Sequence, residues 1–282
     1  MSIADYFLMR RKRMARAQNT QDQTLAQIRA YLRTLKLPKM EKALDEQLSY
    51  GARENLPVSK VLERLLTIEA DSLIERRIER RIKDSRLPER KLLSDFDFTF
   101  QKGIDQSQIM ELATLSFVER KQGLILAGSS GTGKSHMAKA LLLIGCRKLY
   151  RCRYITAADM LKDLMASLAD GTLEQKLKLY TKPDILLIDE VGFDRLEQES
   201  ARNASLFFKV IDQRYCKAST LLTTNIDFKA LGDYLGDPVI TTAIVDRMVH
   251  HSIIIHIQGP SWRMKESKKL NSSSKRKSSE IS

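Results

Sequence analysis

A glycine-rich loop directly after a short apolar run is the feature that most limits how this chain can fold. Residues 124–127 have the length and composition of a buried strand, and the loop that follows has the pattern G-x-x-x-x-G-K-S. Its three glycines allow several backbone N–H groups to point at one anion, and a helix that begins near Lys134 would add the positive end of its dipole. The pattern therefore predicts a strand, a phosphate-binding loop and a helix. The loop residues are Gly128, Ser129, Ser130, Gly131, Thr132, Gly133, Lys134 and Ser135.

The side chains of this loop predict a nucleotide and a metal ion. We expect the Lys134 ammonium group to neutralise the β and γ phosphates, and the Ser135 hydroxyl to bind Mg²⁺.

Two further strand-like runs, of which the first is apolar, end in polar residues that complete such a site. Residues 185–188 lead directly into Asp189 and Glu190, and residues 220–224 lead into Asn225. Ligands of open α/β sheets bind at the carboxyl ends of the strands, so we expect these side chains beside the loop. Asp189 is expected to hold Mg²⁺ through water, and Glu190 to polarise the water that attacks the γ phosphate. The Asn225 amide, which both donates and accepts hydrogen bonds, is expected to orient that water.

The same residues distinguish an ATPase from a GTPase and from a small-molecule kinase. Residues 189–192 fit the D-x-x-G pattern of GTPases, but Asn225 is followed by Ile226 and Asp227, so the N-K-x-D pattern that reads guanine is absent. Small-molecule kinases with such a loop usually lack the adjacent acidic pair. ATP hydrolysis is therefore the expected activity, with ATP and Mg²⁺ as the expected cofactors.

Hydrophobic periodicity predicts an α/β fold with a small all-helical domain before it. Apolar residues recur at helical spacing over residues 25–35, 40–48 and 58–66, and Ile74, Ile78 and Ile82 mark a further helix. Strand-like runs at residues 124–127, 153–156, 185–189, 220–224 and 252–257 alternate with helical stretches. This alternation predicts a five-stranded parallel sheet covered by helices on both faces, which suffices for a complete phosphate-loop nucleotide-binding domain.

The composition along the chain predicts four parts. They are a basic N-terminal arm at residues 1–20, a helical domain at residues 21–90 that binds DNA or a partner, an ATPase domain at residues 91–264, and a disordered basic tail at residues 265–282. Phe96, Phe98 and Phe100 alternate with polar residues at the entry to the ATPase domain. One of these rings is a candidate to lie against adenine, and core packing is the alternative for the others.

The positive charge of the chain is concentrated in three segments. Residues 1–20, 75–91 and 263–282 carry +4, +4 and +5, which accounts for the whole net charge of +13. Segregated positive charge is typical of contact with the nucleic-acid backbone, whereas solvated surface is the alternative for each segment. The candidate DNA-binding residues are Arg76, Arg77, Arg80, Arg81, Arg11, Arg13, Lys275 and Arg276.

The sequence indicates neither a membrane protein nor a cysteine-based metal site. No stretch approaches eighteen uninterrupted apolar residues, and the basic N-terminus is not followed by an apolar signal core. Cys146, Cys152 and Cys216 lack a paired metal-binding spacing, and an odd, scattered set suits a reducing compartment. We therefore expect a cytoplasmic protein without a membrane partner.

The order of the motifs resembles the IstB group of AAA+ ATPases, which are ATP-binding helper proteins of insertion sequences and are similar to the helicase loader DnaC. The resemblance spans roughly residues 24–265. It is carried by the phosphate loop, I-D-E-V-G at residues 188–192, T-T-N at residues 223–225, I-V-D-R-M-V-H-H at residues 244–251 and G-P-S-W-R at residues 259–263.

This resemblance implies a homo-oligomer, assembled with ATP and DNA, whose sites are shared between neighbours. Arg247 matches the arginine that reaches the γ phosphate of the adjacent subunit, with an ion pair to a nearby acid as the alternative, and Arg263 matches a second sensor of bound nucleotide. The expected function is that of an ATP-dependent regulator that binds DNA, with duplex favoured, and directs a transposase to it. The alternatives are a DnaC-like loader of a replicative helicase and an ATP-dependent protein adaptor without DNA contact.

Overall fold

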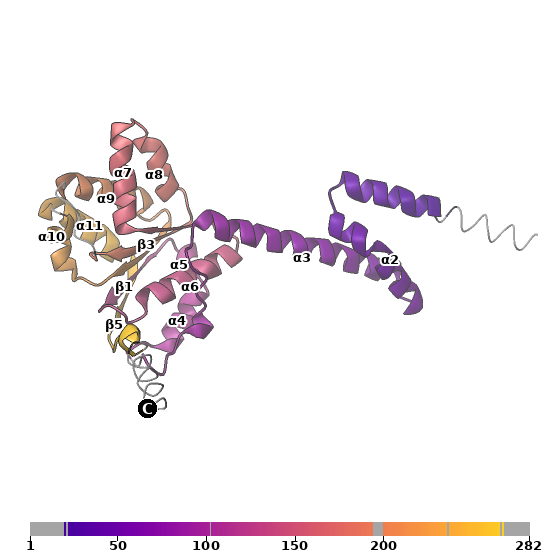
Figure 1. The fold of residues 1–282 in the computed structure, drawn as a ribbon, viewed down its shortest axis with the longest axis horizontal. Coiled ribbons are helices and arrows are strands. Elements are labelled where there is room, and N and C mark those ends of the chain that lie inside the picture. The colour runs from indigo at the N-terminus through magenta and orange to yellow at the C-terminus, as the bar shows by residue number, and fades with distance from the viewer. Residues whose placement is uncertain are drawn as a thin grey trace, which may run out of the picture. The chain divides into compact units, whose positions relative to one another are not determined.

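The computed structural model describes residues 20, 22–101, 103–193, 200–235, 237–265 and 267 (Figure 1). The chain divides into two compact units between Arg77 and Ile78, inside helix α3 (Val58–Ser85). The basic arm with Arg11 and Arg13, and the tail positions Lys275 and Arg276, lie outside the described residues. The domain limits expected from the sequence stay predictions. Among the described residues, no helix is both long enough and apolar enough to cross a membrane.

The first unit is a small helical assembly with its own core. It consists of helical residues 22–34, helix α2 (Pro38–Arg53) and the first part of α3, and its core is formed by Leu32, Met40, Leu44 and Leu65. The buried Glu69 carboxylate on α3 accepts hydrogen bonds from the backbone N–H groups of Lys39 and Met40, at 2.7 and 2.9 Å. Because the first N–H groups of a helix have no partner within it, this carboxylate caps α2 and fixes it against α3.

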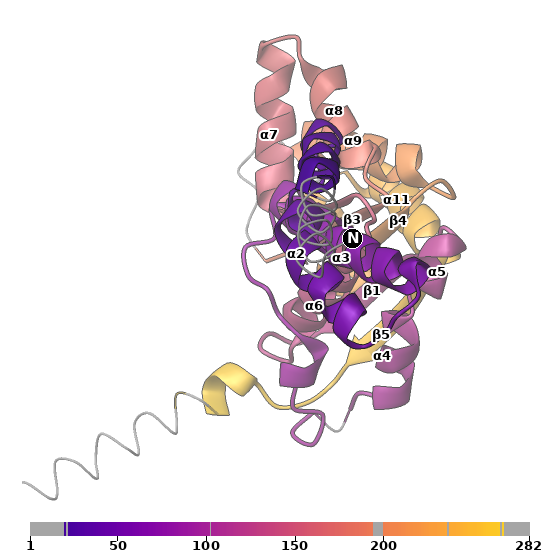
Figure 2. The ribbon, with the colours of Figure 1, turned by 90° about the vertical axis from the view of Figure 1, so that its right-hand side faces the viewer.

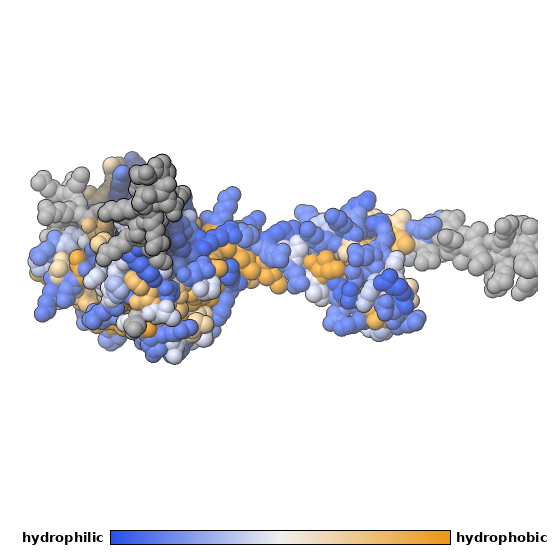
Figure 3. Space-filling model, turned by 60° about the horizontal axis from the view of Figure 1, so that its bottom comes forward, coloured by the Kyte–Doolittle hydropathy of each residue, from blue (hydrophilic) through white to orange (hydrophobic). Residues whose placement is uncertain are grey.

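Helix α3 is longer than the periodicity predicts. The segments expected to form two helices, residues 58–66 and the segment with Ile74, Ile78 and Ile82, are one continuous helix. The reason is that no glycine or proline lies between Val58 and Ser85, so nothing interrupts the backbone hydrogen bonds. Several apolar residues of this helix are exposed, and Figure 3 shows apolar surface among the hydrophilic surface of the molecule. They include Val58, Leu62, Leu66, Leu73 and Ile74.

The second unit is built on the predicted five-stranded parallel sheet. Its strand order is β2 (Cys152–Thr156), β3 (Ile185–Val191), β4 (Ser219–Thr224), β1 (Gly123–Gly128) and β5 (Ser252–Ile257). All four neighbouring pairs are parallel, so every strand ends at the same edge of the sheet. The predicted fold class is confirmed.

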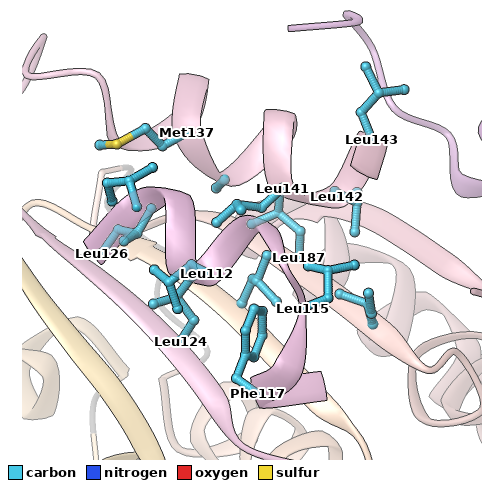
Figure 4. Packing of buried hydrophobic residues seen from close by; sticks show 14 of the residues in the cluster. Leu112, Leu115, Phe117, Leu124, Leu126, Met137, Leu141, Leu142, Leu143 and Leu187 are labelled. Atoms are coloured by element: carbon cyan, nitrogen blue, oxygen red, sulfur yellow. The ribbon is translucent and has the colours of Figure 1, made fainter. Parts of the chain in front are cut away.

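Helices cover both faces of this sheet, because successive strand residues point to opposite sides. Leu124 and Leu126 pack with α6 (Lys134–Arg147), whereas Ile125 packs in the cluster on the other face. Figure 4 shows the first cluster, in which Leu141 lies near Leu187 and Leu112 lies near Leu124.

The first face is completed by α4 (Gln106–Ala113) and α5 (Ser116–Glu119). The second face is covered by α7 (Ala157–Ala169), α8 (Leu173–Thr181), α9 (Ser200–Arg214), α10 (Leu231–Leu235) and α11 (Pro238–His250). Helices α7 and α8 lie side by side (Figures 1 and 2). Short 3₁₀ helices occur at η1 (Leu93–Asp95) and η2 (Phe228–Ala230).

Candidate nucleotide-binding site

The phosphate loop joins the end of β1 to the start of α6, as its sequence predicts, and its glycines are required by both conformation and space. Gly131 and Gly133 have φ angles of +78° and +97°, in the region that side chains disfavour. A Cβ atom on Gly131 would lie 2.1 Å from Ser261 Oγ, and one on Gly133 would lie 2.4 Å from a ring carbon of Phe96. The loop is therefore packed closely against two segments that are distant in the sequence.

Lys134 is buried at the start of α6, where its charge is poorly solvated. Its Nζ donates a hydrogen bond of 2.7 Å to the Ser129 carbonyl oxygen. Burial lowers the pKa of Lys134, and the positive Arg263 acts in the same direction, whereas the Asp189 carboxylate raises it. A buried ammonium group with so little anionic compensation favours binding of an external anion.

A cavity of about 580 Å³ lies over the loop, which is in the size range of small-molecule sites. It brings together most of the predicted nucleotide-site residues: Ser130, Gly131, Thr132, Gly133, Lys134, Ser135, Glu190, Asn225 and Arg263. Gly128 ends β1, and the Ser129 carbonyl oxygen accepts hydrogen bonds from Lys134 and from Thr132 Oγ1. Gly128 and Ser129 therefore form the base of the loop.

Asp189 is fully buried at the end of β3 and is surrounded by hydrogen-bond donors. Its Oδ1 accepts hydrogen bonds from Ser135 Oγ at 2.8 Å and from Thr223 Oγ1 at 2.5 Å, and its Oδ2 accepts one from the Tyr154 hydroxyl at 3.2 Å. The Lys139 ammonium group lies 3.7 Å from Oδ2. Three hydroxyl donors and one cation hold the carboxylate in a fixed orientation beside the phosphate loop.

Glu190 lines the cavity because β3 is irregular at this point. Ile188 pairs with Leu222 and Val191 pairs with Thr224, so Asp189 and Glu190 together oppose Thr223 alone. This is a β-bulge, which bends a strand and changes the direction of its side chains. Glu190 has a φ angle of +62°, and its side chain is exposed. In a regular strand, two successive carboxylates would point to opposite faces of the sheet.

The segment that contains Arg263 is fastened to the phosphate loop. The buried Gln101 side chain donates hydrogen bonds from Nε2 to the carbonyl oxygens of Thr132 and Pro260, at 3.0 and 2.9 Å. The Trp262 backbone N–H donates to the Gly131 carbonyl oxygen at 2.9 Å. Arg263 is thereby held beside the cavity by backbone and side-chain hydrogen bonds.

The aromatic residues at the entry to this unit have different environments. Phe96 lines the cavity and also packs edge-to-face against Phe98, with a centroid distance of 4.8 Å. Phe98 joins the first core cluster, and Phe100 packs at 5.2 Å against Trp262, which also lines the cavity. Phe96, Trp262 and the exposed Phe193 therefore all line the cavity and are within reach of a base.

Arg247 does not line this cavity within one chain. Its Nε lies 2.9 Å from Asp212 Oδ1, and its guanidinium group stacks over the Phe208 ring at 4.8 Å. About a third of the Arg247 side chain (31%) remains exposed, so a contact with another chain is sterically open. Its predicted role stays a prediction.

The predicted basic residues of α3 differ in their environments. Arg76 pairs with Glu69 at 3.3 Å, and Arg81 is half-buried. Arg77 and Arg80 are exposed and form no ion pair within the part of the chain that the structure describes.

Several residues of the site had no assigned role in the sequence: Thr223, Tyr154, Lys139 and Gln101. The only available signal is the position of Thr223 at the end of a strand-like run, directly before Thr224 and Asn225. Cys146 and Cys152 are buried and Cys216 is exposed, and all three are free. Within the described ranges, no group of histidine, cysteine and acidic residues could hold a metal by itself.

Comparison with known proteins agrees with this geometry. A model of the family of IstB-like ATP binding proteins matches residues 30–270. The chain is 38% identical over 239 residues to the ATP-binding protein of insertion sequence IS5376 of Geobacillus stearothermophilus, covering 85% of this chain and 94% of that protein. It is 37% identical over 243 residues to that of insertion sequence IS21 of Pseudomonas aeruginosa, covering 86% and 91%.

Among solved structures, the crystal structure of DnaI is similar in fold. It has a TM-score of 0.51 and 23% identity, over 60% of this chain and 92% of that chain.

Proposed function

Because the chain belongs to the family of IstB-like ATP binding proteins and has an AAA+ fold, we propose that it is a Mg²⁺-dependent ATPase that regulates DNA transposition. The observation that carries the enzymatic part is the contact between the phosphate loop and the acidic strand end. Ser135 Oγ lies 2.8 Å from the buried Asp189 carboxylate, and the next residue, Glu190, lines the cavity. A merely structural loop would not need two carboxylates beside a buried lysine.

The residues present fit a magnesium ion. The Ser135 hydroxyl and the Asp189 carboxylate are hard oxygen ligands, which Mg²⁺ prefers, and they already lie next to each other. When bound, Mg²⁺ would neutralise part of the phosphate charge.

The remaining residues of the cavity divide the chemistry among them. The loop N–H groups and Lys134 bind the phosphates, and Glu190 accepts a proton from the water that attacks the γ phosphorus. Asn225 orients this water, and Arg263 contacts the terminal phosphate. The bond from the γ phosphorus to the bridging oxygen breaks as the new bond to water forms, which gives ADP and phosphate.

Transposition is the favoured context because the similar proteins belong to insertion sequences. In this proposal the chain binds duplex DNA through basic residues such as Arg77 and Arg80, whose exposed side chains remain available to phosphates. It assembles side by side with copies of itself when ATP and DNA are present. The assembly then recruits the transposase of the same element.

Two substitutions test the enzymatic part. Lys134→Ala should abolish ATP binding, because it removes the charge that compensates the phosphates. Glu190→Gln should retain binding and lose hydrolysis, because only the proton acceptor changes. Nucleotide affinity and phosphate release measured on both proteins decide the question. Glu174→Gln, which changes an exposed acid of α8, serves as the control with unchanged activity.

Normal phosphate release by the Glu190→Gln protein would remove Glu190 from the mechanism.

The biological part of the proposal, the regulation of transposition, is tested by adding the transposase of the same element to the protein on duplex DNA. ATP should increase DNA integration in the wild-type reaction, and Lys134→Ala should not support this increase. A transposase that integrates equally well without the protein would contradict the proposal.

A further inference from the structure

We propose that Thr223 is the positioning residue that sets both acids of the site, so that one hydroxyl group fixes the metal-binding and the water-activating carboxylates relative to each other. This inference rests on the proposed ATPase function. Thr223 lies on β4, one strand away from the residues it orders, and only 1% of it is exposed.

The β-bulge in β3 allows Thr223 to contact both Asp189 and Glu190. Between the pairs Ile188 with Leu222 and Val191 with Thr224, β3 has two residues where β4 has one. In a regular parallel pair, each residue of β3 would face its own neighbour on β4. Here Thr223 faces Asp189 and Glu190 together, and these are the two residues to which the chemistry is assigned.

The two hydrogen bonds of the Thr223 hydroxyl have a defined direction. The Glu190 backbone N–H can only donate, and it does so to Thr223 Oγ1 at 2.9 Å. The ionised Asp189 carboxylate can only accept, so the hydroxyl proton points to Asp189 Oδ1, at 2.5 Å. The Thr223 hydroxyl therefore donates a hydrogen bond to the Asp189 carboxylate and accepts one from the Glu190 backbone. The branched Cβ of threonine restricts χ1 and keeps the hydroxyl in this position.

The two acids depend on Thr223 to different degrees. Asp189 also accepts hydrogen bonds from Ser135 and Tyr154. Over the described ranges, Thr223 is the only side chain that hydrogen-bonds to the Glu190 backbone N–H. Glu190 is also in the left-handed region, at a φ angle of +62°, which is unfavourable for a residue with a side chain. Loss of the hydroxyl should therefore affect the direction of the Glu190 side chain more than the position of Asp189.

Thr223→Val tests the proposal, because valine has nearly the same shape and lacks the hydroxyl. The turnover number should fall at least about tenfold, as expected when a hydrogen bond that involves a charged group is lost. ATP affinity in EDTA should stay within about twofold, since Lys134 and the loop are unchanged. The gain in ATP affinity on addition of Mg²⁺ should become smaller, because Asp189 loses one of its donors.

A second pair of variants separates the hydroxyl from the methyl group. Thr223→Ser and Thr223→Ala both remove the methyl group, but only serine keeps the hydroxyl. Serine should retain turnover within about threefold of the wild type, and alanine should be as slow as valine. Equal turnover of the serine and alanine variants, or wild-type turnover in the folded valine variant, overturns the proposal.

Thr220→Val is the matched structural control. Thr220 lies on the same strand, and its hydroxyl accepts a hydrogen bond of 2.9 Å from Arg214 Nε rather than contacting the acids. This variant should be less stable to urea but should hydrolyse ATP at the wild-type rate per folded molecule. A wild-type chain that hydrolyses no ATP would overturn the proposed function instead. The Mg²⁺-dependent gain in ATP affinity would then still decide whether Thr223 positions Asp189.

Discussion

At the scale of single residues, Arg214 shows that burial in this protein is not restricted to apolar groups. It is 1% exposed at the end of α9, and burial lowers its pKa to about 9, which still leaves it charged at neutral pH. Its guanidinium group donates to the carbonyl oxygens of Tyr180 and Pro183, at 2.9 and 2.8 Å, and to that of Ser219, at 2.5 Å. One side chain thus satisfies backbone groups at the end of α8, before β3 and at the start of β4.

We expect Arg214→Met to lower the free energy of unfolding by about 3 kcal/mol or more, because several buried carbonyl oxygens lose their donor. Urea unfolding measures this change. Arg202→Met is the matched control, since Arg202 is exposed on the same helix and should change stability by less than about 0.5 kcal/mol. Equal stability of the two variants would show that water replaces the guanidinium group.

The sequence predicts residues of this site where local pattern decides their place. Lys134, Ser135, Asp189 and Asn225 follow from loops and strand ends, because parallel strands bring their carboxyl ends to one edge. The position of Gln101 does not follow in this way. It joins carbonyl oxygens 31 and 159 residues away, and no periodicity in the sequence records such a contact.

At the scale of elements, the five strands are predicted to within about two residues, because each is a short run of apolar, aromatic or β-branched residues between turns or helices. The bulge in β3 is not predicted, since nothing in I-D-E-V-G distinguishes an extra residue from a regular strand end. Helix α3 is also not predicted as a single element. Its apolar spacing changes along its length, whereas its continuity depends on the absence of breaking residues.

Among the predicted DNA-binding residues that the structure describes, Arg77 and Arg80 of helix α3 are exposed and form no ion pair. Changing Arg77 and Arg80 together to Gln should weaken duplex DNA binding and reduce the slope of log affinity against log salt by about 1.8, or about 0.9 for each lost phosphate contact. Affinities measured over a range of salt concentrations test this expectation. The control is Arg33→Gln with Arg53→Gln, which removes the same charge from arginines already paired with Glu41 and Glu54. Identical slopes for both double variants would mean that α3 acts only through net charge.

At the scale of the whole molecule, the role proposed for Arg247 requires two chains to complete one site, because Arg247 does not line the cavity of its own chain. Arg247→Ala should bind ATP normally and lose hydrolysis if the arginine acts on a neighbouring subunit, because the loop and Lys134 are unchanged. Mixing this variant with Glu190→Gln should restore part of the activity, since one chain supplies an intact pocket and the other an intact arginine.

The control mixture replaces the Glu190→Gln chain by one that carries both substitutions and should remain inactive. Phosphate release and the mass of the assembly are measured together, with ATP and DNA present. Full activity of Arg247→Ala alone would contradict the shared site and show that Arg247 has only a structural role, through its contacts with Asp212 and Phe208.

The strand order also determines when the molecule can first bind ATP during its synthesis. The strand before the phosphate loop, β1, has β4 and β5 as its two neighbours, and both are made later than β1. A nascent chain that has emerged only as far as α8 contains the loop without either neighbouring strand. Such non-local pairing is formed late in folding. A ribosome-bound chain should therefore acquire its nucleotide site only after β5 and Trp262 have left the exit tunnel, so the first motif to be synthesised is among the last to become functional.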